Sequence, residues 1–519
     1  ACSQWLIRGI RFHFEPGRLA DDPRCALNRV VVVGAGIGGL SAAALLARAG
    51  IDTTVLEANT YPGGCAGTFP RSGYRFDAGA TLPVGFYPGG PMDILSRVLR
   101  IDWPAHPDPR VMTVHLPDGS AVTRRSDDSR WDERRSAFGA PGERFWRWQE
   151  QAADELWDFA LRLPPWPPQS ARQVMAFGAA GADWLRGDLR SRLSPGLAAD
   201  AFRPVAAHLG GASERLRLFV DSQLMISAQT TSAQAVALYG AAALDLPRRG
   251  PAHLPGGMGA AAGLLADAVA RFGGRVLYRQ EAARVVMEGG RAVAVETRNG
   301  DSFAADGVVL NVTPGNAAAL VDGKDPSYPP DGWGAFMLYA GLDGSAVPAE
   351  AVLHHQVVTR EPLSEGNAPF ISISPAWDET RAPIGLRAVT ISAHTRIADW
   401  WALRRSDRAA YDARKSEYAA RVLAACETAI PGIRDAAEFV LTATPVTFRR
   451  YTRRAGGWVG GFPQSSLFRF HGPRYRRGIW IAGDSIFPGQ SVAAAALGGI
   501  RVARQVLALP DSSGKIRDL

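Results

Sequence analysis

The sequence predicts an α/β protein in two parts: a Rossmann-type dinucleotide-binding domain that is discontinuous in the chain, and an α+β domain inserted into it. Three observations predict this fold. A glycine-rich strand–helix–strand unit lies near the N-terminus, a hairpin-rich segment follows in the middle, and a strand leading into a small-residue helix lies near the C-terminus. A chain of 519 residues is also long enough to form two lobes with separate cores.

The composition is that of a globular protein. Hydrophobic residues make up 46% of the sequence and charged residues 21%, which excludes the disordered and fibrous classes. The formal net charge of +8 comes mostly from scattered arginines and not from a basic tract. The charge by itself is compatible with several anionic partners, and we expect no nucleic acid among them.

Two further features narrow the class of protein. The longest apolar runs, residues 30–49 and 491–500, are interrupted by glycine, so neither is expected to cross a bilayer. The cysteines lie far apart and show no metal-ligand spacing, which predicts a reducing, cytosolic compartment and no structural metal. These cysteines are Cys2, Cys25, Cys65 and Cys426.

The first element is a strand followed by a glycine-rich turn. Residues 30–33 form a β-branched strand, and Gly34, Gly36 and Gly39 supply a GxGxxG pattern where a helix must begin. In this pattern the first glycine makes the tight turn, the second lets the backbone approach a pyrophosphate, and the third packs the helix on the sheet. The helix N-terminus then offers free N–H groups to the phosphates. The other turn residues expected at the cofactor are Ile37 and Gly38.

A second strand and an acidic residue follow this helix. Residues 53–56 read as a short strand that ends in Glu57, with Ala58 next in the chain. A carboxylate at this distance from GxGxxG binds ribose hydroxyls. Strand, glycines, helix, second strand and acid together predict a dinucleotide site and not only a glycine-rich turn.

The residues after Glu57 favour FAD over NAD as the dinucleotide. A second glycine pair, Gly63 and Gly64, is followed by the Phe-Asp-Ala-Gly sequence at residues 76–79. This arrangement resembles the extended FAD signature of flavoproteins of the glutathione-reductase and amine-oxidase type. An NAD site has no need of a second glycine turn, so we expect FAD. Cys65 is expected to be a small packing residue near it.

In that class of flavoprotein the nucleotide-binding domain returns later in the chain. Residues 253–314 read as a glycine turn, a helix, a short strand, a β-meander with hairpin turns at 289–290 and 299–300, and a final strand. The resemblance implies that Val285 lies where the backbone contacts adenine. For the Val285 side chain itself, a plain role in a buried strand is an equally good interpretation.

The C-terminal segment completes the predicted site. Residues 479–482 form a strand, Gly483 permits close backbone approach, and the Asp484 carboxylate can accept hydrogen bonds from the ribityl hydroxyls of a flavin. A helix that begins near Gln490 directs its positive end toward the isoalloxazine ring. The alternative role for Asp484 is that of a helix N-cap. Two further residues expected at the cofactor are Ser491 and Val492.

From Arg29 to Leu507 the chain resembles the phytoene desaturase and carotenoid isomerase family of FAD-dependent enzymes. The ending AGDSIFPGQSVAAAALGGIRVARQV is similar to the carotene cis-trans isomerase branch. Residues 216–259 resemble most the bacterial carotenoid C-3',4' desaturases of the same branch. Residues 443–464 resemble the Thr-Pro and Gly-x-x-Gly segment of the family.

The resemblance implies a bacterial carotenoid desaturase, an FAD-dependent oxidoreductase acting on CH–CH bonds. Two hydrogens would pass from an apolar polyene to the flavin, beginning with a hydride to N5, and then to an acceptor such as a quinone or oxygen. One alternative is a redox-neutral carotenoid isomerase that uses reduced FAD. Others are a flavin amine oxidase, which needs an aromatic cage and a lysine near N5, and a carotenoid carrier without activity.

No catalytic residue can be named from the sequence. It contains no Ser-His-Asp set, no metal cluster and no convincing carboxylate pair, which fits a reaction supported mainly by an apolar tunnel and the correct distance to the flavin. The pair His354-His355 is the nearest approach to a proton-handling cluster. A core-packed or solvated pair is the more ordinary role for these two histidines.

Aromatic residues between 143 and 189 allow two interpretations. A pair of amphipathic helices could bury them in the core, or they could form an interfacial surface at lipid headgroups. Because family members are commonly membrane-associated, the resemblance implies a cytoplasmic protein in peripheral contact with a membrane. The tryptophans of this segment are Trp146, Trp148, Trp157, Trp166 and Trp184.

These observations predict the following domain organisation. Residues 1–28 carry no secretory-signal pattern and are expected to be an extension outside the fold, and residues 511–519 a tail. The FAD-binding domain is expected to comprise residues 29–110, 241–320 and 441–510. The substrate and membrane-facing domain is expected to comprise residues 111–240 and 321–440.

Overall fold

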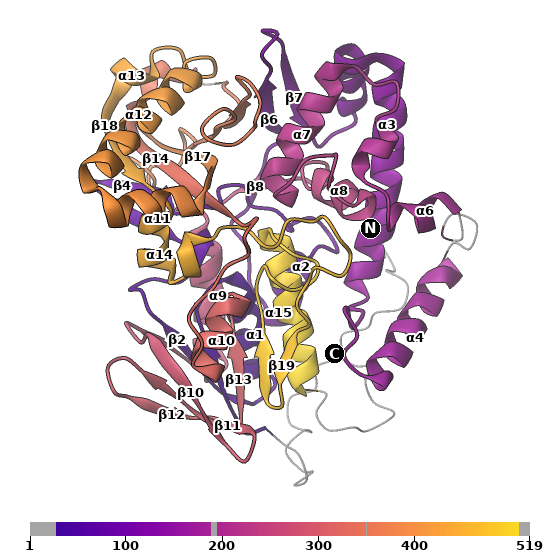
Figure 1. Ribbon diagram of the computed structural model, residues 1–519, viewed down its shortest axis with the longest axis vertical. Coiled ribbons are helices and arrows are strands. Elements are labelled where there is room, and N and C mark those ends of the chain that lie inside the picture. Colours follow the sequence, from indigo (N-terminus) through magenta and orange to yellow (C-terminus); the bar gives the residue numbers. More distant parts are fainter. Residues whose placement is uncertain (1–26, 188–191, 193–194, 349, 508–519) are drawn as a thin grey trace, which may run out of the picture.

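The computed structural model describes residues 27–187, 192, 195–348 and 350–507 (Figure 1). Most of the expected N-terminal extension, the whole expected tail, and both Cys2 and Cys25 lie outside the described residues.

One large sheet holds the segments predicted to bind the dinucleotide. Its strand order is β19-β20-β13-β1-β2-β9, and neighbouring strands run parallel except β19 beside β20. Val30, Val31 and Val32 of β1 are at most 2% exposed, because the central strand is covered on both faces. The strands are β1 (Arg29–Val33), β2 (Asp52–Glu57), β9 (Arg275–Tyr278), β13 (Gly307–Leu310), β19 (Arg474–Arg476) and β20 (Ile479–Ile481).

Helices and a small sheet cover this parallel sheet. The helix after the glycine turn, α1 (Ile37–Arg48), packs against α9 (Gly259–Arg271) and α15 (Val492–Leu507). The antiparallel meander β10 (Ala282–Glu288), β11 (Arg291–Thr297) and β12 (Ser302–Ala304) contacts β1 and β13. These contacts join residues from three distant parts of the chain into one structure.

A second large sheet lies in the inserted part of the chain. Its order is β18-β14-β17-β16-β15-β6-β7, antiparallel except between β15 and β6. Phe336, Trp400 and Tyr418 form an aromatic cluster between this sheet and the helices α11 (Ile397–Ser406) and α12 (Arg408–Cys426). The strands are β6 (Arg110–His115), β7 (Ala121–Arg125), β14 (Trp333–Asp343), β15 (His354–Val357), β16 (Phe370–Ile373), β17 (Leu386–Arg396) and β18 (Ala437–Ala443).

A helical region lies beside the two sheets, on the right in Figure 1. Its longest helix bends at Gly139, where φ is 63° and Pro141 follows. This helix buries Trp146 and Trp157, so the core interpretation is confirmed for these two aromatics, whereas α4 has no buried residue. The helices are α3 (Arg130–Leu161), α4 (Ala171–Gly187), α6 (Pro195–Asp200), α7 (Glu214–Ala228) and α8 (Ala237–Leu244).

Short elements connect these layers. Thr68 and Asp77 face each other across the hairpin β3–β4, and a hydrogen bond of 2.7 Å joins their side chains. The short elements are β3 (Thr68–Arg71), β4 (Tyr74–Asp77), α2 (Pro91–Leu99), β5 (His106–Pro107), β8 (Ala252–His253), α10 (Pro314–Asp322), α13 (Ile433–Ala436), α14 (Pro445–Thr452), and the 3-10 turns η1 (Gly64–Ala66), η2 (Val205–His208), η3 (Gly344–Ala346) and η4 (Ala455–Gly457).

Candidate functional site

The GxGxxG turn leaves no room for larger side chains. Gly34 adopts a φ of +95°, which favours glycine. A Cβ atom at Gly36 would lie 2.6 Å from Asn311 Nδ2, and one at Gly39 would lie 2.4 Å from the Gly34 carbonyl oxygen. The turn therefore has the close backbone approach that a pyrophosphate site requires. Ile37 and Gly38 are buried in the first turn of α1.

The two glycine turns meet in space. Gly36 and Gly63 form a backbone bridge, and the Gly63 N–H donates to the Ala35 carbonyl oxygen at 2.8 Å. Gly63 has a φ of +114° and Gly64 a φ of +57°, so this second turn also depends on glycine. The structure thus brings together two of the predicted cofactor segments.

Glu57 ends β2 beside these turns. Its carboxylate accepts hydrogen bonds from the Ala35 N–H and the Asn59 N–H, both at 2.8 Å. Burial raises the pKa of the Glu57 carboxyl above its usual range, and the N–H groups of Asn59 and Ala35 oppose that shift. Glu57 therefore fixes the glycine turn from the side, next to half-buried Ala58.

The C-terminal segment that contains Gly483 lies against the first glycine turn. A Cβ atom at Gly38 would lie 3.0 Å from the Gly483 backbone nitrogen, so the start of α1 and the end of β20 are in contact. Asn311, directly after β13, sits between them and donates from Nδ2 to the Gly34 carbonyl oxygen at 3.3 Å. Sequence reasoning missed Asn311, because only the parallel pairing of β13 with β1 and β20 carries it to this point.

Asp484 has a partner that sequence reasoning also missed. Arg454 donates to both Asp484 carboxylate oxygens, at 2.7 and 3.0 Å. The alternative role of Asp484 as a helix N-cap is wrong, because α15 begins at Val492 and the Ser491 hydroxyl caps it by accepting from the Ala494 N–H at 3.0 Å.

Three further residues were predicted to lie at the cofactor: Gln490, Val492 and Val285. Gln490 donates from its side-chain amide to the Ile226 carbonyl oxygen at 3.0 Å, which ties the end of the loop to α7. Val492 is buried at the start of α15. Val285 is 5% exposed and lies in β10, the edge strand of the meander.

The Phe-Asp-Ala-Gly segment has a structural role. Asp77 accepts hydrogen bonds from the Met258 N–H at 2.9 Å and from the Thr68 hydroxyl at 2.7 Å. Its other oxygen forms an ion pair with Arg381 at 3.1 Å, and both side chains are less than 10% exposed. Asp77 thus joins the hairpin, the glycine turn before α9 and the loop between β16 and β17.

A small, uncharged pocket of about 30 Å³ adjoins the end of the C-terminal segment that contains Asp484. Trp157 and Ala160 of α3 and Tyr239 and Ala242 of α8 form one wall. Pro488, Ser491 and Ala494, which follow Asp484 in the chain, form another part of the lining. The whole lining, including Ser227 and Gln464, contains no charged residue.

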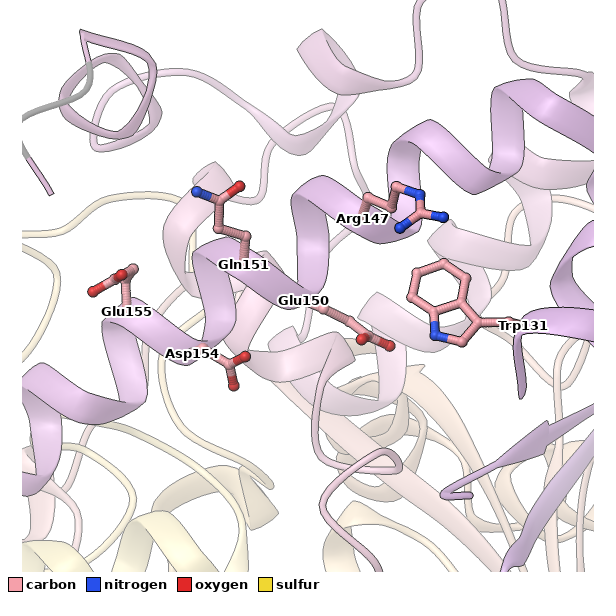
Figure 2. Close-up of a pocket in the computed structure, with 6 residues that line it drawn as sticks. All are labelled: Trp131, Arg147, Glu150, Gln151, Asp154 and Glu155. Carbon is pink, nitrogen blue, oxygen red and sulfur yellow. The ribbon is translucent and has the colours of Figure 1, made fainter. Parts of the chain in front are cut away.

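A second pocket lies on the outer side of α3 and is polar. Figure 2 shows its lining, with Trp131 beside Arg147 and Glu150. Glu150 forms ion pairs with Arg130 and Arg134, so its charge already has partners within the protein. Such a pocket does not suit a polyene, and the network serves to fix the helical region.

His354 and His355 are both buried, which agrees with a core-packed pair. His354 Nδ1 lies 2.9 Å from the Ser372 hydroxyl, and His355 Nδ1 lies 3.2 Å from His115 Nε2. Burial, together with the nearby His115, lowers the pKa of His355 to about 4. Burial also lowers the pKa of His354 well below its ordinary value. Both imidazoles are therefore neutral at pH 7.

A family model described as an NAD(P)-binding Rossmann-like domain matches residues 32–93. The chain is 26% identical to the chloroplastic prolycopene isomerase of Daucus carota, over 92% of this chain and 80% of that protein. It is 28% identical to the hydroxyneurosporene desaturase of Cereibacter sphaeroides, over 92% of this chain and 97% of that protein. The chain resembles the carotenoid isomerase and desaturase family.

Solved structures share the fold. A putrescine oxidase matches with a TM-score of 0.58 at 16% identity, covering 93% of this chain and 99% of that one. Cyclohexylamine oxidase from Brevibacterium oxydans IH-35A matches with a TM-score of 0.57 at 16% identity, covering 93% and 98%. Together with the domain match, these likenesses confirm the predicted α/β fold class, and the Rossmann-like domain implies a dinucleotide cofactor.

The comparisons do not favour the bacterial desaturases, which residues 216–259 were predicted to resemble most. The plant prolycopene isomerases match the chain more strongly than the bacterial desaturases, which include the phytoene desaturase (neurosporene-forming) of Rhodobacter capsulatus, although the identities are all 26–28%. Identity at this level does not separate an isomerase from a desaturase.

Among the described residues, no helix is both long and apolar enough to cross a bilayer. Within the same residues, no group of three histidine, cysteine or acidic side chains is placed to hold a metal ion.

Proposed function

We propose that the protein is an FAD-dependent carotenoid desaturase. The observation that carries this proposal is the similarity to carotenoid isomerases and desaturases along most of the chain. The pocket beside the loop that follows Asp484 has an uncharged lining that suits an apolar polyene, and its volume of about 30 Å³ means that it must widen to admit one. The second glycine turn against the first supports FAD as the dinucleotide.

The residues present fit a bound FAD. The glycines of the first turn leave space that a Cβ atom would fill, Glu57 is held at that turn and would bind the ribose, and Gly483 contacts the start of α1. Bound FAD would supply the acceptor for a hydride from the polyene. The pocket residues Trp157, Tyr239 and Pro488 would exclude water and hold the polyene against that acceptor. Of the two hydrogens lost by the polyene, one would leave as the hydride and the other as a proton released to water, and a quinone or oxygen would then take the two electrons.

Anaerobic mixing tests whether this reaction is an oxidation. Purified, FAD-loaded protein is mixed with acyclic and monocyclic carotenoids in liposomes, and the absorbance of the oxidised flavin is followed. The desaturase proposal expects the flavin to bleach in proportion to the carotenoid consumed. Turnover that begins only after the flavin has been reduced beforehand would replace this proposal with a redox-neutral isomerase.

The isomerase is the second candidate, and the prolycopene isomerases among the relatives favour it. An amine oxidase is less well supported although the fold is shared. The pocket lining contains neither a lysine nor a carboxylate to meet a cationic amine.

Filling the pocket is expected to block turnover without loss of cofactor. Ala242 lines the pocket and is 9% exposed, so Ala242→Phe places a ring in the space proposed for the polyene. We expect carotenoid turnover to fall at least about tenfold while the FAD content stays unchanged. Ala270→Phe makes the same change at an exposed position of α9 and serves as the control. Full activity of Ala242→Phe would show that this pocket does not hold the substrate.

The membrane contact is proposed for the surface of α4. Val174 and Met175 are 56% and 69% exposed on this helix, and Phe177 of the same helix contacts Trp166. Trp166 also contacts Phe468, which is 64% exposed, so the apolar surface extends beyond α4. A bilayer is the proposed occupant because carotenoids dissolve in it, and the net charge of +8 suits anionic lipid.

Charges on α4 are expected to release the protein from membranes. We expect the double variant Val174→Glu and Met175→Glu to bind liposomes containing anionic lipid at least about fivefold more weakly in a sedimentation assay. Ile384→Glu is the control, because Ile384 is 85% exposed in the turn before β17, away from α4 in the sequence. Equal loss of binding in both proteins would contradict a specific role for α4.

A further inference from the structure

A largely buried ion pair joins two segments of the dinucleotide site. Arg454 Nη1 lies 2.7 Å from one Asp484 oxygen and Nη2 lies 3.0 Å from the other. The side chains are 13% and 22% exposed. This two-pronged geometry fixes the orientation of the carboxylate as well as its charge.

The Arg454 guanidinium is held from several sides. Nη2 also donates to the Gly460 carbonyl oxygen at 2.9 Å, and the group lies 5.4 Å from the centre of the Trp458 ring. The backbone next to it is fixed by Asn316, whose side-chain oxygen accepts from the Ala455 N–H at 3.0 Å. Arg454 Nε is buried and makes no hydrogen bond among the described residues.

The pair faces the second glycine turn. Arg454 Nη1 lies 3.5 Å from the sulfur of Cys65, the residue that follows Gly63 and Gly64. Asp484 follows Gly483, which contacts the start of α1. Burial lowers the pKa of Arg454, but the Asp484 carboxylate and Cys65 outweigh burial, so the net pKa is raised and the guanidinium stays charged.

Charge at this position matters for a flavin dinucleotide. The pyrophosphate is an anion, and the flavin ring gains negative charge when it is reduced. An isolated Asp484 carboxylate would repel both, and in a poorly solvated site that repulsion is only weakly screened. A positive partner directly on the carboxylate removes this repulsion and leaves the side chain in place.

We propose that Arg454 is a positioning residue of the cofactor site, which orients Asp484 toward the hydroxyls of bound FAD and cancels the negative charge of Asp484 beside the flavin. The inference rests on the proposed function in one respect only, that the dinucleotide is FAD. It requires no carotenoid.

The test is a pair of opposite charge changes, read out as the midpoint potential of the bound flavin against a reference dye at pH 8. Arg454→Met leaves the carboxylate without a partner, so reduction becomes harder and the potential falls. Asp484→Asn leaves the guanidinium without a partner, so reduction becomes easier and the potential rises. We expect at least a tenfold change in the reduction equilibrium in each direction, which is about 30 mV for a two-electron couple.

Three further variants show whether the shifts in potential arise from the charges of this ion pair. The double variant Arg454→Met, Asp484→Asn has lost both charges and is expected to return to within about 10 mV of the wild-type potential, a little over twofold in the equilibrium. Arg454→Lys keeps the charge without the two-pronged geometry and is expected to keep the potential while binding FAD more weakly. Arg453→Met removes an exposed guanidinium that pairs with Glu281 and is expected to change neither property.

The results distinguish a failure of the role proposed for Arg454 from a failure of the proposed carotenoid desaturase function. Potentials that shift in the same direction in both single variants, or in neither, overturn the inference. If Arg454→Met does not retain FAD, recovery of FAD binding in the double variant supports it and lack of recovery overturns it. A wild-type protein that binds no FAD contradicts both the inference and the proposed cofactor. If the flavin potentials shift as predicted but the protein acts on no carotenoid, the inference about Arg454 stands and only the proposed carotenoid substrate is contradicted.

Discussion

Gly39→Val is expected to abolish dinucleotide binding. The added Cβ atom would lie 2.4 Å from the Gly34 carbonyl oxygen and 2.8 Å from Asn311 Cβ, and both neighbours belong to the strand ends that form the site. The helix α1 must therefore move away from β1, which separates its N–H groups from the proposed pyrophosphate position. We expect FAD affinity to fall at least about 100-fold and stability to fall by about 1–3 kcal/mol.

Titration of the apoprotein with FAD measures this effect. Gly263→Ala is the matched control, because Gly263 lies inside α9 and a Cβ atom there meets nothing within 4 Å. That change is expected to leave FAD binding unchanged and to stabilise the helix by up to about 1 kcal/mol. Unchanged FAD affinity in Gly39→Val would mean that the cofactor does not bind at this turn.

Asp77→Ala is expected to destabilise the fold severely. The change removes the partner of the buried Arg381 guanidinium and the acceptor for the Met258 N–H and the Thr68 hydroxyl. Removing one partner of a buried ion pair leaves an uncompensated charge and costs about 3–5 kcal/mol. The expected result is a large fall in the free energy of unfolding in urea.

An exposed ion pair provides the comparison for Asp77. Arg408 and Asp412 also form an ion pair, but their side chains are 59% and 51% exposed. Asp412→Ala is therefore expected to leave the free energy of unfolding nearly unchanged. Equal effects of the two substitutions would contradict the structural role assigned to Asp77.

The parts of the site that follow one another in the chain could be predicted from the sequence. The glycine turn, the strand end at Glu57 and the second glycine turn are local patterns, because turn geometry and helix starts depend on neighbouring residues. The fold class follows from the same patterns and is confirmed by the Rossmann-like domain and the amine-oxidase-like structures.

The parts that depend on tertiary contact could not be predicted. Asn311 reaches the first glycine turn because β13 pairs with β1, and no spacing in the sequence signals that side chain. Arg454 lies in the segment RRYTRR, whose four arginines look alike in sequence, and only the tertiary contact with Asp484 distinguishes it from the other three. The start of α15 was expected near Gln490 and is at Val492, because Ser491 supplies the cap.

The central claim is the removal of two hydrogens from a carotenoid by a flavin held at the three glycine-containing segments. Its most direct test is the mass of the product formed from one equivalent of carotenoid by the FAD-loaded protein without oxygen. The account predicts a product two hydrogens lighter and one flavin reduced for each product formed. A product of unchanged mass and altered double-bond geometry would contradict it and establish the isomerase instead.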